Sequence, residues 1–321
     1  MTDLTSPIYN DEEAARRHFE AIRWPEGPIC PHCGSVNNAT ELQGKSTRAG
    51  VYKCKDCQGP FTVTVGTLFE RSHIPLHKWL LAVHLLTSSK KGMSAHQLYR
   101  MLGFGSYRTA WFMAHRIRES FRELFPEGSD PMGGDGKTVE IDETYIGGKA
   151  TNRHKHQRGM GRGRGFPKAP VFALVERDGR ARAFHVPEVT GANLREIVRK
   201  HVAPETTIYS DEGHTTRSAA HGYKTDSVNH QDGEYVRDNV YTNTVEGYFA
   251  TLKRGIMGTY HHVSEQHLDR YLAEFSFRHS NRAGLGVEDS ERAVKALQGV
   301  SGKRLTYRQS TVKRTDEQTG A

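Results

Sequence analysis

The sequence predicts an α/β fold with a mixed sheet and flanking helices, preceded by a metal-binding module and a small helical domain. Three features support this prediction. Two CxxC pairs lie near the amino terminus, residues 75–125 carry apolar side chains at helical spacing, and residues 138–278 alternate β-like and helical runs. Consecutive strands followed by strand–helix–strand order are typical of a mixed sheet covered by helices.

Composition favours a nucleic acid partner over a membrane. The 321 residues suffice for two or three domains, and the formal net charge of +8 suits a polyanionic partner. The longest apolar run, residues 79–86, is too short to span a bilayer. The acidic amino terminus differs from a secretory signal, so we expect a cytoplasmic protein with no membrane partner.

Cysteine spacing predicts a structural zinc site in the first domain, residues 1–67. The pairs CPHC and CKDC are separated by 20 residues. Two such pairs can hold one Zn²⁺ tetrahedrally, and a site closed by four cysteines leaves no position open for chemistry. Disulfides are not expected in a reducing compartment. The predicted zinc ligands are Cys30, Cys33, Cys54 and Cys57.

Two further elements are predicted in the first domain. Residues 10–23 have the apolar spacing of a helix, and the following segment WPEGP ends it. The metal-binding ribbon comes next. Its last segment, residues 61–67, alternates polar and apolar side chains, so we expect a strand there.

The second predicted domain, residues 68–130, has the pattern of a helix-turn-helix. Ser94 can cap one helix, Gly103 can end it, and Ser106 can begin the next. Two helices joined by a tight glycine turn are what a helix-turn-helix requires. An ordinary helical hairpin that links two domains would give the same pattern. If the segment binds DNA, the residues that meet DNA first are Tyr107, Arg108 and Thr109.

A third predicted domain, residues 134–285, follows a boundary rich in Gly and Pro at residues 125–137. It contains the mixed sheet, and a polar, basic tail of residues 286–321 comes after it. The expected strands are residues 138–148, 170–179, 180–189, 206–213 and 223–230, and the expected helices are residues 191–204, 242–256 and 264–278.

A strongly basic segment, residues 149–168, interrupts the third domain. It has seven Lys or Arg residues, two His, four Gly and no acidic residue, so it cannot bury a core. We expect a loop whose cations Arg158, Arg162 and Arg164 contact DNA phosphates. A solvated hairpin tip would have the same composition.

Three acidic residues in this domain could form a metal site. Asp142 alternates with Val139 and Ile141 on the first strand, so its side chain faces the opposite side of the sheet. Asp211 ends the fourth strand, and Glu246 lies on a later helix without a charged partner at helical spacing. Three carboxylates at one sheet edge could hold two Mg²⁺ or Mn²⁺ ions.

Each of these acids also has a plainer interpretation. Asp142 could be a solvated strand residue beside Glu140 and Glu143, and the carboxylate of Asp211 could cap the turn that follows it. Asn243 could cap the helix that carries Glu246.

Several motifs together resemble the DDE-type transposases of bacterial insertion sequences. IDETYIGGK, YSDEG and NTVEGYFATLKRG contain the three acids, with 68 residues between the two aspartates and 34 between Asp211 and Glu246. RWPEGPICPHCG, the second cysteine pair and HKWLLAVHLLTSSKKGMSAHQLYRMLG are similar to the zinc ribbon and helical region of one insertion-sequence group. The similarity covers residues 10–285.

The resemblance implies a ribonuclease-H-like catalytic fold and a nucleoid-associated bacterial transposase. Asp142, Asp211 and Glu246 would bind two divalent ions, Mg²⁺ or Mn²⁺, and Lys253 would join them as a catalytic residue that meets the DNA near the scissile phosphate. We also expect Arg254, the next residue, to contact DNA. The expected partners are double-stranded DNA, as the element's terminal repeats and as target DNA, and further copies of the chain in a homodimer or larger assembly. The alternatives are a DNA-binding regulator or catalytically inactive transposase relative that uses only the ribbon and the helix-turn-helix, and a nuclease of the same fold that cuts without joining.

Overall fold

The computed structural model describes residues 3–122, 130–147, 168–211, 213–228 and 242–306. None of the helices in this part of the chain combines the length and apolar character needed to cross a membrane. The elements are η1 (Pro7–Tyr9), α1 (Glu12–Arg23), β1 (Ala39–Glu41), β2 (Tyr52–Cys54), β3 (Pro60–Phe61), α2 (Leu76–Ser88), α3 (Ala95–Met101), α4 (Tyr107–Ser120), β4 (Thr138–Ile146), β5 (Ala169–Glu176), β6 (Ala181–His185), α5 (Gly191–His201), β7 (Thr207–Asp211), α6 (His214–Ala219), β8 (Lys224–Val228), α7 (Asn243–Gly255), the π-helical turn η5 (Ile256–Tyr260), α8 (Glu265–Ser280), η6 (Ala283–Leu285) and α9 (Asp289–Gln298).

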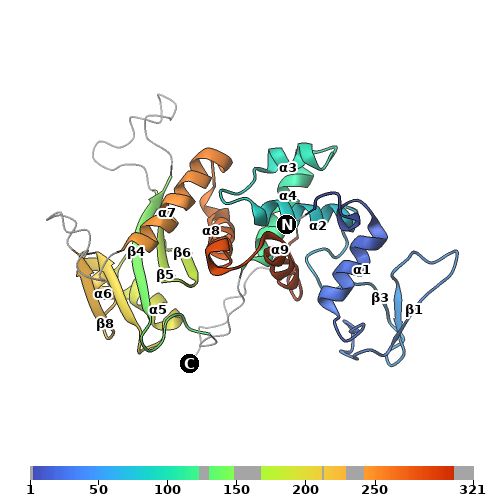
Figure 1. Cartoon of the computed structure of the whole chain (residues 1–321), viewed down its shortest axis with the longest axis horizontal. Coiled ribbons are helices and arrows are strands. Elements are labelled where there is room, and N and C mark those ends of the chain that lie inside the picture. The colour runs from blue at the N-terminus through green and yellow to red at the C-terminus, as the bar shows by residue number, and fades with distance from the viewer. Residues whose placement is uncertain (1–2, 123–129, 148–167, 212, 229–241, 307–321) are drawn as a thin grey trace, which may run out of the picture.

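The molecule is elongated, with a five-stranded sheet at one end and a three-stranded ribbon at the other (Figure 1). Helices α2, α4, α8 and α9 lie between these two ends. The sheet has the order β6-β5-β4-β7-β8, in which β5 is antiparallel to both neighbours and β4, β7 and β8 are mutually parallel. This mixed sheet with flanking helices confirms the predicted fold class.

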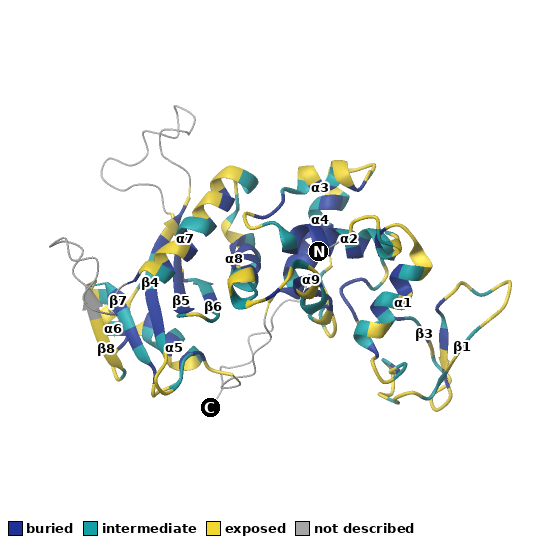
Figure 2. Cartoon of the chain, viewed as in Figure 1, coloured by how far each residue is buried: buried dark blue, intermediate teal, exposed yellow. Residues whose placement is uncertain are grey.

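Helices cover both faces of the sheet, and Figure 2 shows that β4 and β5 are largely buried between them. On one face, apolar side chains of β5 pack against α7 and α8, with Val245, Leu252 and Leu272 among the buried residues. On the other face, Val139 and Ile141 pack with residues of α5 and α6. Asp142 therefore faces α7, as the alternation along the strand predicts.

The ribbon has short strands and an aromatic centre. Trp24, which follows α1, contacts the rings of Tyr52 and Phe61 edge-on at centroid distances of 5.5 and 5.7 Å. The strand expected at residues 61–67 is wrong, because β3 ends at Phe61. The chain turns instead, with backbone bonds from Val65 to Thr62 and from Thr67 to Thr64. These turns let buried Val63 and the segment after it pack into the helical core.

The helical hairpin forms as predicted. The Ser94 hydroxyl accepts a hydrogen bond from the Gln97 N–H at the start of α3. Gly103 follows the end of α3 with a φ of +60°, a conformation that favours glycine. Ser106 precedes α4, although its side chain makes no capping hydrogen bond.

The predicted polar tail, residues 286–321, is wrong in its first part, because Asp289–Gln298 forms α9. Ala293, Ala296 and Leu297 give this helix a short apolar stripe, which joins one buried cluster with residues of α1, α2, α4 and the ribbon. The buried guanidinium of Arg292 donates to the carbonyl oxygens of neighbouring turns, including that of Thr87 at 3.2 Å. The stripe is short and charged residues surround it in the sequence, so the helix was not predicted. Residues 307–321 lie outside the described part of the chain.

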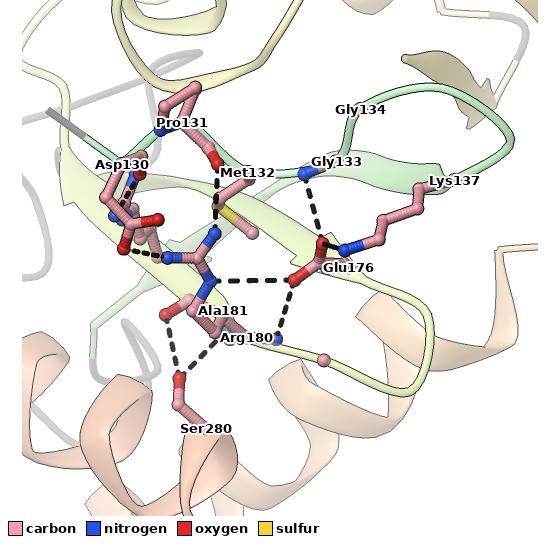
Figure 3. A network of polar contacts seen from close by, with 12 residues as sticks. Asp130, Pro131, Met132, Gly133, Gly134, Lys137, Glu176, Arg180, Ala181 and Ser280 are labelled. Atoms are coloured by element: carbon pink, nitrogen blue, oxygen red, sulfur yellow. Dashed lines mark hydrogen bonds and ion pairs between the residues drawn. The ribbon is translucent and has the colours of Figure 1, made fainter. Parts of the chain in front are cut away.

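The segment that leads into the sheet is fixed at the β5–β6 turn (Figure 3). The carboxylate of Glu176, at the end of β5, accepts a bond from the Gly133 N–H at 3.0 Å and one from the Arg180 N–H at 3.3 Å. Arg180 pairs with Asp130 and donates to the Pro131 carbonyl at 2.9 Å. These bonds hold the segment before β4, the strand that carries Asp142, against the β5–β6 turn.

Candidate active site

The register of the sheet brings Asp142 and Asp211 together. Strands β4 and β7 pair in parallel, with Glu140 opposite Tyr209. Two residues further along each strand, the same register places Asp142 next to Asp211, and the two carboxylates interact electrostatically. Asp142 is half-buried, and its Oδ1 accepts a bond from the Glu143 N–H at 2.7 Å.

Helix α7 supplies the third acid. Glu246 is exposed in the first turn, next to buried Val245, which packs against the sheet. The Thr242 hydroxyl donates to Glu246 Oε1 at 3.2 Å. This hydrogen bond joins the residue before α7 to the first turn of the helix.

The electrostatics of Asp142 link the three acids. Burial raises the pKa of Asp142 to about 7, and repulsion from Asp211 adds to the rise, with smaller contributions from Glu143 and Glu246. Burial also raises the pKa of Glu143, and Asp211 contributes there too. A group of acids that repel one another in a partly buried position is the donor set that a hard divalent cation neutralises.

The acids approach one another without forming a compact ligand cluster. In the described part of the chain, the four cysteines form the group of three or more metal-binding side chains whose ligand atoms all lie within 4.8 Å of one another. The side chains present, three carboxylates on two strands and a helix, fit a Mg²⁺ or Mn²⁺ site.

Asp211 also has the local role that its position after a strand allowed. Its Oδ1 accepts bonds from the Gly213 N–H at 3.2 Å and from the Thr216 hydroxyl at 2.7 Å. These bonds fix the start of α6. They also fix the carboxylate itself, so the capping interpretation and a metal-binding role are compatible.

The burial of Asp142 and of the nearby acids Glu140 and Glu143 was not predicted from the sequence. The solvated-strand interpretation of Asp142 is wrong, because Asp142 is half-buried and burial raises its pKa. Of the acids beside it, Glu140 is fully buried and Glu143 is half-buried with its Oε2 unpartnered among the described residues. The start of α7 is bound by Glu140, whereas Asn243 is exposed in its first turn. Strand alternation, which places Glu140 on the same face as Asp142, could have revealed this.

The four cysteines have the geometry of a zinc site. Cys30 Sγ lies 3.6 Å from Cys57 Sγ, and Cys33 Sγ lies 3.7 Å from Cys54 Sγ. A tetrahedron with Zn–S bonds of about 2.3 Å has edges of about 3.8 Å. Burial raises the pKa of Cys30, but the backbone N–H groups of Cys33 and His32 and the neighbouring thiols lower it further, to about 6. The set therefore fits Zn²⁺.

Five of the predicted DNA-binding residues lie at two places in the structure, the start of α4 and the last turn of α7. Tyr107 and Arg108 are exposed at the start of α4, with Thr109 half-buried beside them. Lys253 and Arg254 are exposed in the last turn of α7, about two turns from Glu246. Arg158, Arg162 and Arg164 lie outside the described residues.

Comparisons with known proteins agree with this organisation. Residues 133–280 match the ISXO2-like transposase domain, and residues 10–59 match a transposase zinc-ribbon domain. An uncharacterised protein in the transposable element ISH50 of Halobacterium salinarum is 31% identical over 278 residues, which cover 83% of this chain and 90% of the relative. Among solved structures, a chain of the simian T-cell lymphotropic virus intasome in complex with PP2A regulatory subunit B56 gamma matches with 13% identity and a TM-score of 0.26. That match covers 56% of this chain and 63% of the solved chain, slightly under two thirds.

Proposed function

Since this chain belongs to the family of ISXO2-like transposases, we propose that it cuts DNA at the terminal repeats of a mobile element and joins the freed 3′ ends to target DNA. The observation that carries this proposal is the position of Asp142 beside Asp211 at one sheet edge, facing the helix that bears Glu246. The raised pKa of Asp142 supports the proposal. Burial and the neighbouring acids cause the rise, and pKa shifts with such causes are common at functional sites.

In this proposal, the three carboxylates are the ligands of two divalent cations. When bound, such a pair activates the attacking oxygen and stabilises the oxygen that leaves phosphorus. The chain itself binds and orients the DNA. Lys253 and Arg254 are exposed on the helix that carries Glu246, where cations would contact phosphates near the site of cleavage. No side chain attacks phosphorus, so no covalent enzyme–DNA intermediate forms.

The remaining parts would recognise the DNA. The exposed start of α4, with Tyr107 and Arg108, and the zinc ribbon are the proposed reading surfaces for the terminal repeats. Transposition requires two element ends held together, so we propose that the chain acts as a homodimer or larger assembly on DNA. The excess of Lys and Arg over acidic residues supports binding to both substrates.

A cleavage assay tests the function. The protein with its zinc, a labelled duplex carrying the DNA that flanks its gene, and Mg²⁺ or Mn²⁺ should give nicked and joined products. Asp142→Asn should reduce cleavage on the order of 10³-fold, equivalent to about 4 kcal/mol, while DNA binding stays within about twofold. Asp135→Asn, at an exposed position before β4, is the control and should cleave normally.

Each alternative has its own outcome. Retained cleavage in Asp142→Asn would refute the catalytic assignment. Salt-sensitive binding without cation-dependent cleavage by the unmodified protein would favour a DNA-binding regulator. Cleavage without joined products would favour a nuclease of the same fold.

A further inference from the structure

We infer that Glu140 is a positioning residue that holds the first turn of α7, and with it Glu246, at the sheet edge that carries Asp142 and Asp211. This inference rests on the function proposed above. It assigns a task to a buried carboxylate that contacts neither cation nor DNA in that proposal.

The contacts of Glu140 connect β4 to the beginning of α7. Its side chain is 0% exposed. Its Oε2 accepts bonds from the backbone N–H groups of Thr244 at 2.8 Å and Val245 at 3.0 Å, and its Oε1 accepts one from the Thr244 hydroxyl at 2.9 Å. N–H groups in the first turn of a helix have no partner within the helix, and the helix dipole favours a carboxylate there. Glu246 directly follows Val245 in this turn of α7.

Arg177, directly after β5, extends this connection to β7. Its Nε donates to Glu140 Oε1 at 2.8 Å, and its guanidinium lies 4.7 Å from the centre of the Tyr209 ring. Tyr209 lies opposite Glu140 in the parallel register. Two residues further along these same strands are Asp142 and Asp211. A row formed by Glu140, Arg177 and Tyr209 therefore underlies the row of acids.

This arrangement opposes a force that the site itself creates. Asp142 interacts repulsively with both Asp211 and Glu246, and this repulsion acts to separate α7 from the sheet edge. The bonds to Glu140 resist that movement because they fix the turn that contains Glu246. A buried carboxylate is costly unless its oxygens are satisfied, and the four donors to Glu140, one of them cationic, offset that cost.

The decisive variant is Glu140→Gln in the full chain with its zinc. Glutamine keeps the size of the side chain, but its amide nitrogen cannot accept a bond and would face the N–H donors of α7 or of Arg177. The matched control is Glu176→Gln. Glu176 is also a buried carboxylate of this sheet that accepts backbone N–H bonds and pairs with Arg180, but it lies opposite Val139, and its bonds hold the segment before β4 and the β5–β6 turn instead of α7.

The main measurement is Mn²⁺ binding, followed as loss of the free-ion signal in electron paramagnetic resonance. Thermal unfolding and Mn²⁺-dependent nicking of a supercoiled plasmid that carries the gene's flanking DNA are measured alongside. Glu140→Gln should raise the Mn²⁺ dissociation constant about 10- to 100-fold, the effect typical of residues that orient metal ligands. Glu176→Gln should lower the unfolding temperature to a similar extent but keep the dissociation constant within about twofold.

The outcomes separate this inference from the proposed function. If Asp142→Asn leaves Mn²⁺ binding unchanged, the proposed function fails and the inference fails with it. If Asp142→Asn abolishes binding while Glu140→Gln binds Mn²⁺ as the unmodified chain does, only the inference is wrong. Equal changes in Mn²⁺ affinity in Glu140→Gln and Glu176→Gln would also overturn it, because they would indicate a general loss of structure.

A second pair of variants decides the matter if Glu140→Gln does not fold. Thr244→Val removes only the hydroxyl bond to Glu140, whereas Thr244→Ser keeps that hydroxyl. Thr244→Val should weaken Mn²⁺ binding about threefold or more, and Thr244→Ser should restore it, because one hydrogen bond is worth about 1 kcal/mol. Equal Mn²⁺ affinity in the two variants would overturn the inference.

Discussion

At the scale of single residues, the fold destabilises the ionised form of the Asp142 carboxyl. Its pKa is raised from the ordinary value of 3.8 to about 7, first by burial and then by Asp211. The folded chain therefore binds this proton more tightly than the unfolded chain does. The stability associated with the protonated form is complete below about pH 4 and is lost as the pH rises towards 7.

This shift predicts an unusual stabilising substitution. Without added Mg²⁺ or Mn²⁺, Asp142→Asn should raise the free energy of unfolding at pH 8 on the order of 1–3 kcal/mol and have a much smaller effect at pH 4. Urea unfolding at both pH values measures this difference. Asp135→Asn, at an exposed position, should change neither value by more than about 0.5 kcal/mol. An effect of Asp142→Asn that is equal at the two pH values would contradict the assigned cause.

At the scale of elements, the ribbon is the part least able to hold its own structure. Its strands β1 and β2 have three residues each and β3 has two. Strands this short are marginal without further support. The aromatic contacts of Trp24 join the ribbon to α1, and the four cysteines lie together in a second cluster that a metal can hold.

Zinc removal should therefore unfold the ribbon locally. A chelator should increase amide hydrogen exchange in residues 28–60 by on the order of 10²-fold or more, because structural zinc contributes folding free energy directly. Strands β4 and β5 should keep their protection, which makes them the internal control. Restored protection after zinc is added back completes the test. Unchanged exchange in the ribbon after zinc removal would show that the metal is not structural.

At the scale of the whole molecule, a buried ion network joins the helical region to the sheet domain. Arg118 on α4 donates its Nε–H to Glu274 Oε2 on α8 at 2.6 Å, and both side chains are almost fully buried. Arg278 also pairs with Glu274, and the Tyr260 hydroxyl donates to Glu274 Oε1 at 2.6 Å. The helix whose first turn carries the proposed DNA-binding residues is thus fixed against a helix that packs with α7.

Removing the central charge of this network should be costly. Glu274→Gln leaves two buried guanidinium groups without their carboxylate, so the free energy of unfolding should fall by about 3–5 kcal/mol. Glu291→Gln is the matched control, because Glu291 forms an exposed ion pair with Lys295 at 3.0 Å, worth at most about 1 kcal/mol. Urea unfolding of both variants gives the comparison. Similar losses in the two would show that the buried network does not stabilise the chain.

Patterns of local spacing carried most of the fold prediction. The period of two along β4 placed Asp142 on the face of the sheet away from Val139 and Ile141. The helix expected at residues 264–278 forms as α8, and its side chains at helical spacing, Leu268, Tyr271, Leu272 and Phe275, are buried. The same logic failed at residues 61–67, where an alternating pattern belongs to turns, and at α9, whose stripe of three residues is short and flanked by charges. Short segments bury too little for their own pattern to decide their structure.

The sequence by itself determined the spacing of the four cysteines, most of the order of strands and helices in the sheet domain, and three acids as a candidate set, because each depends on neighbours in the chain or on a motif. Only the tertiary structure decided what surrounds those acids. Glu140 binds Thr244, 104 residues away, and Arg118 binds Glu274, 156 residues away. Such pairs depend on how buried faces pack and on which polar groups must then find partners, and no local pattern specifies that choice.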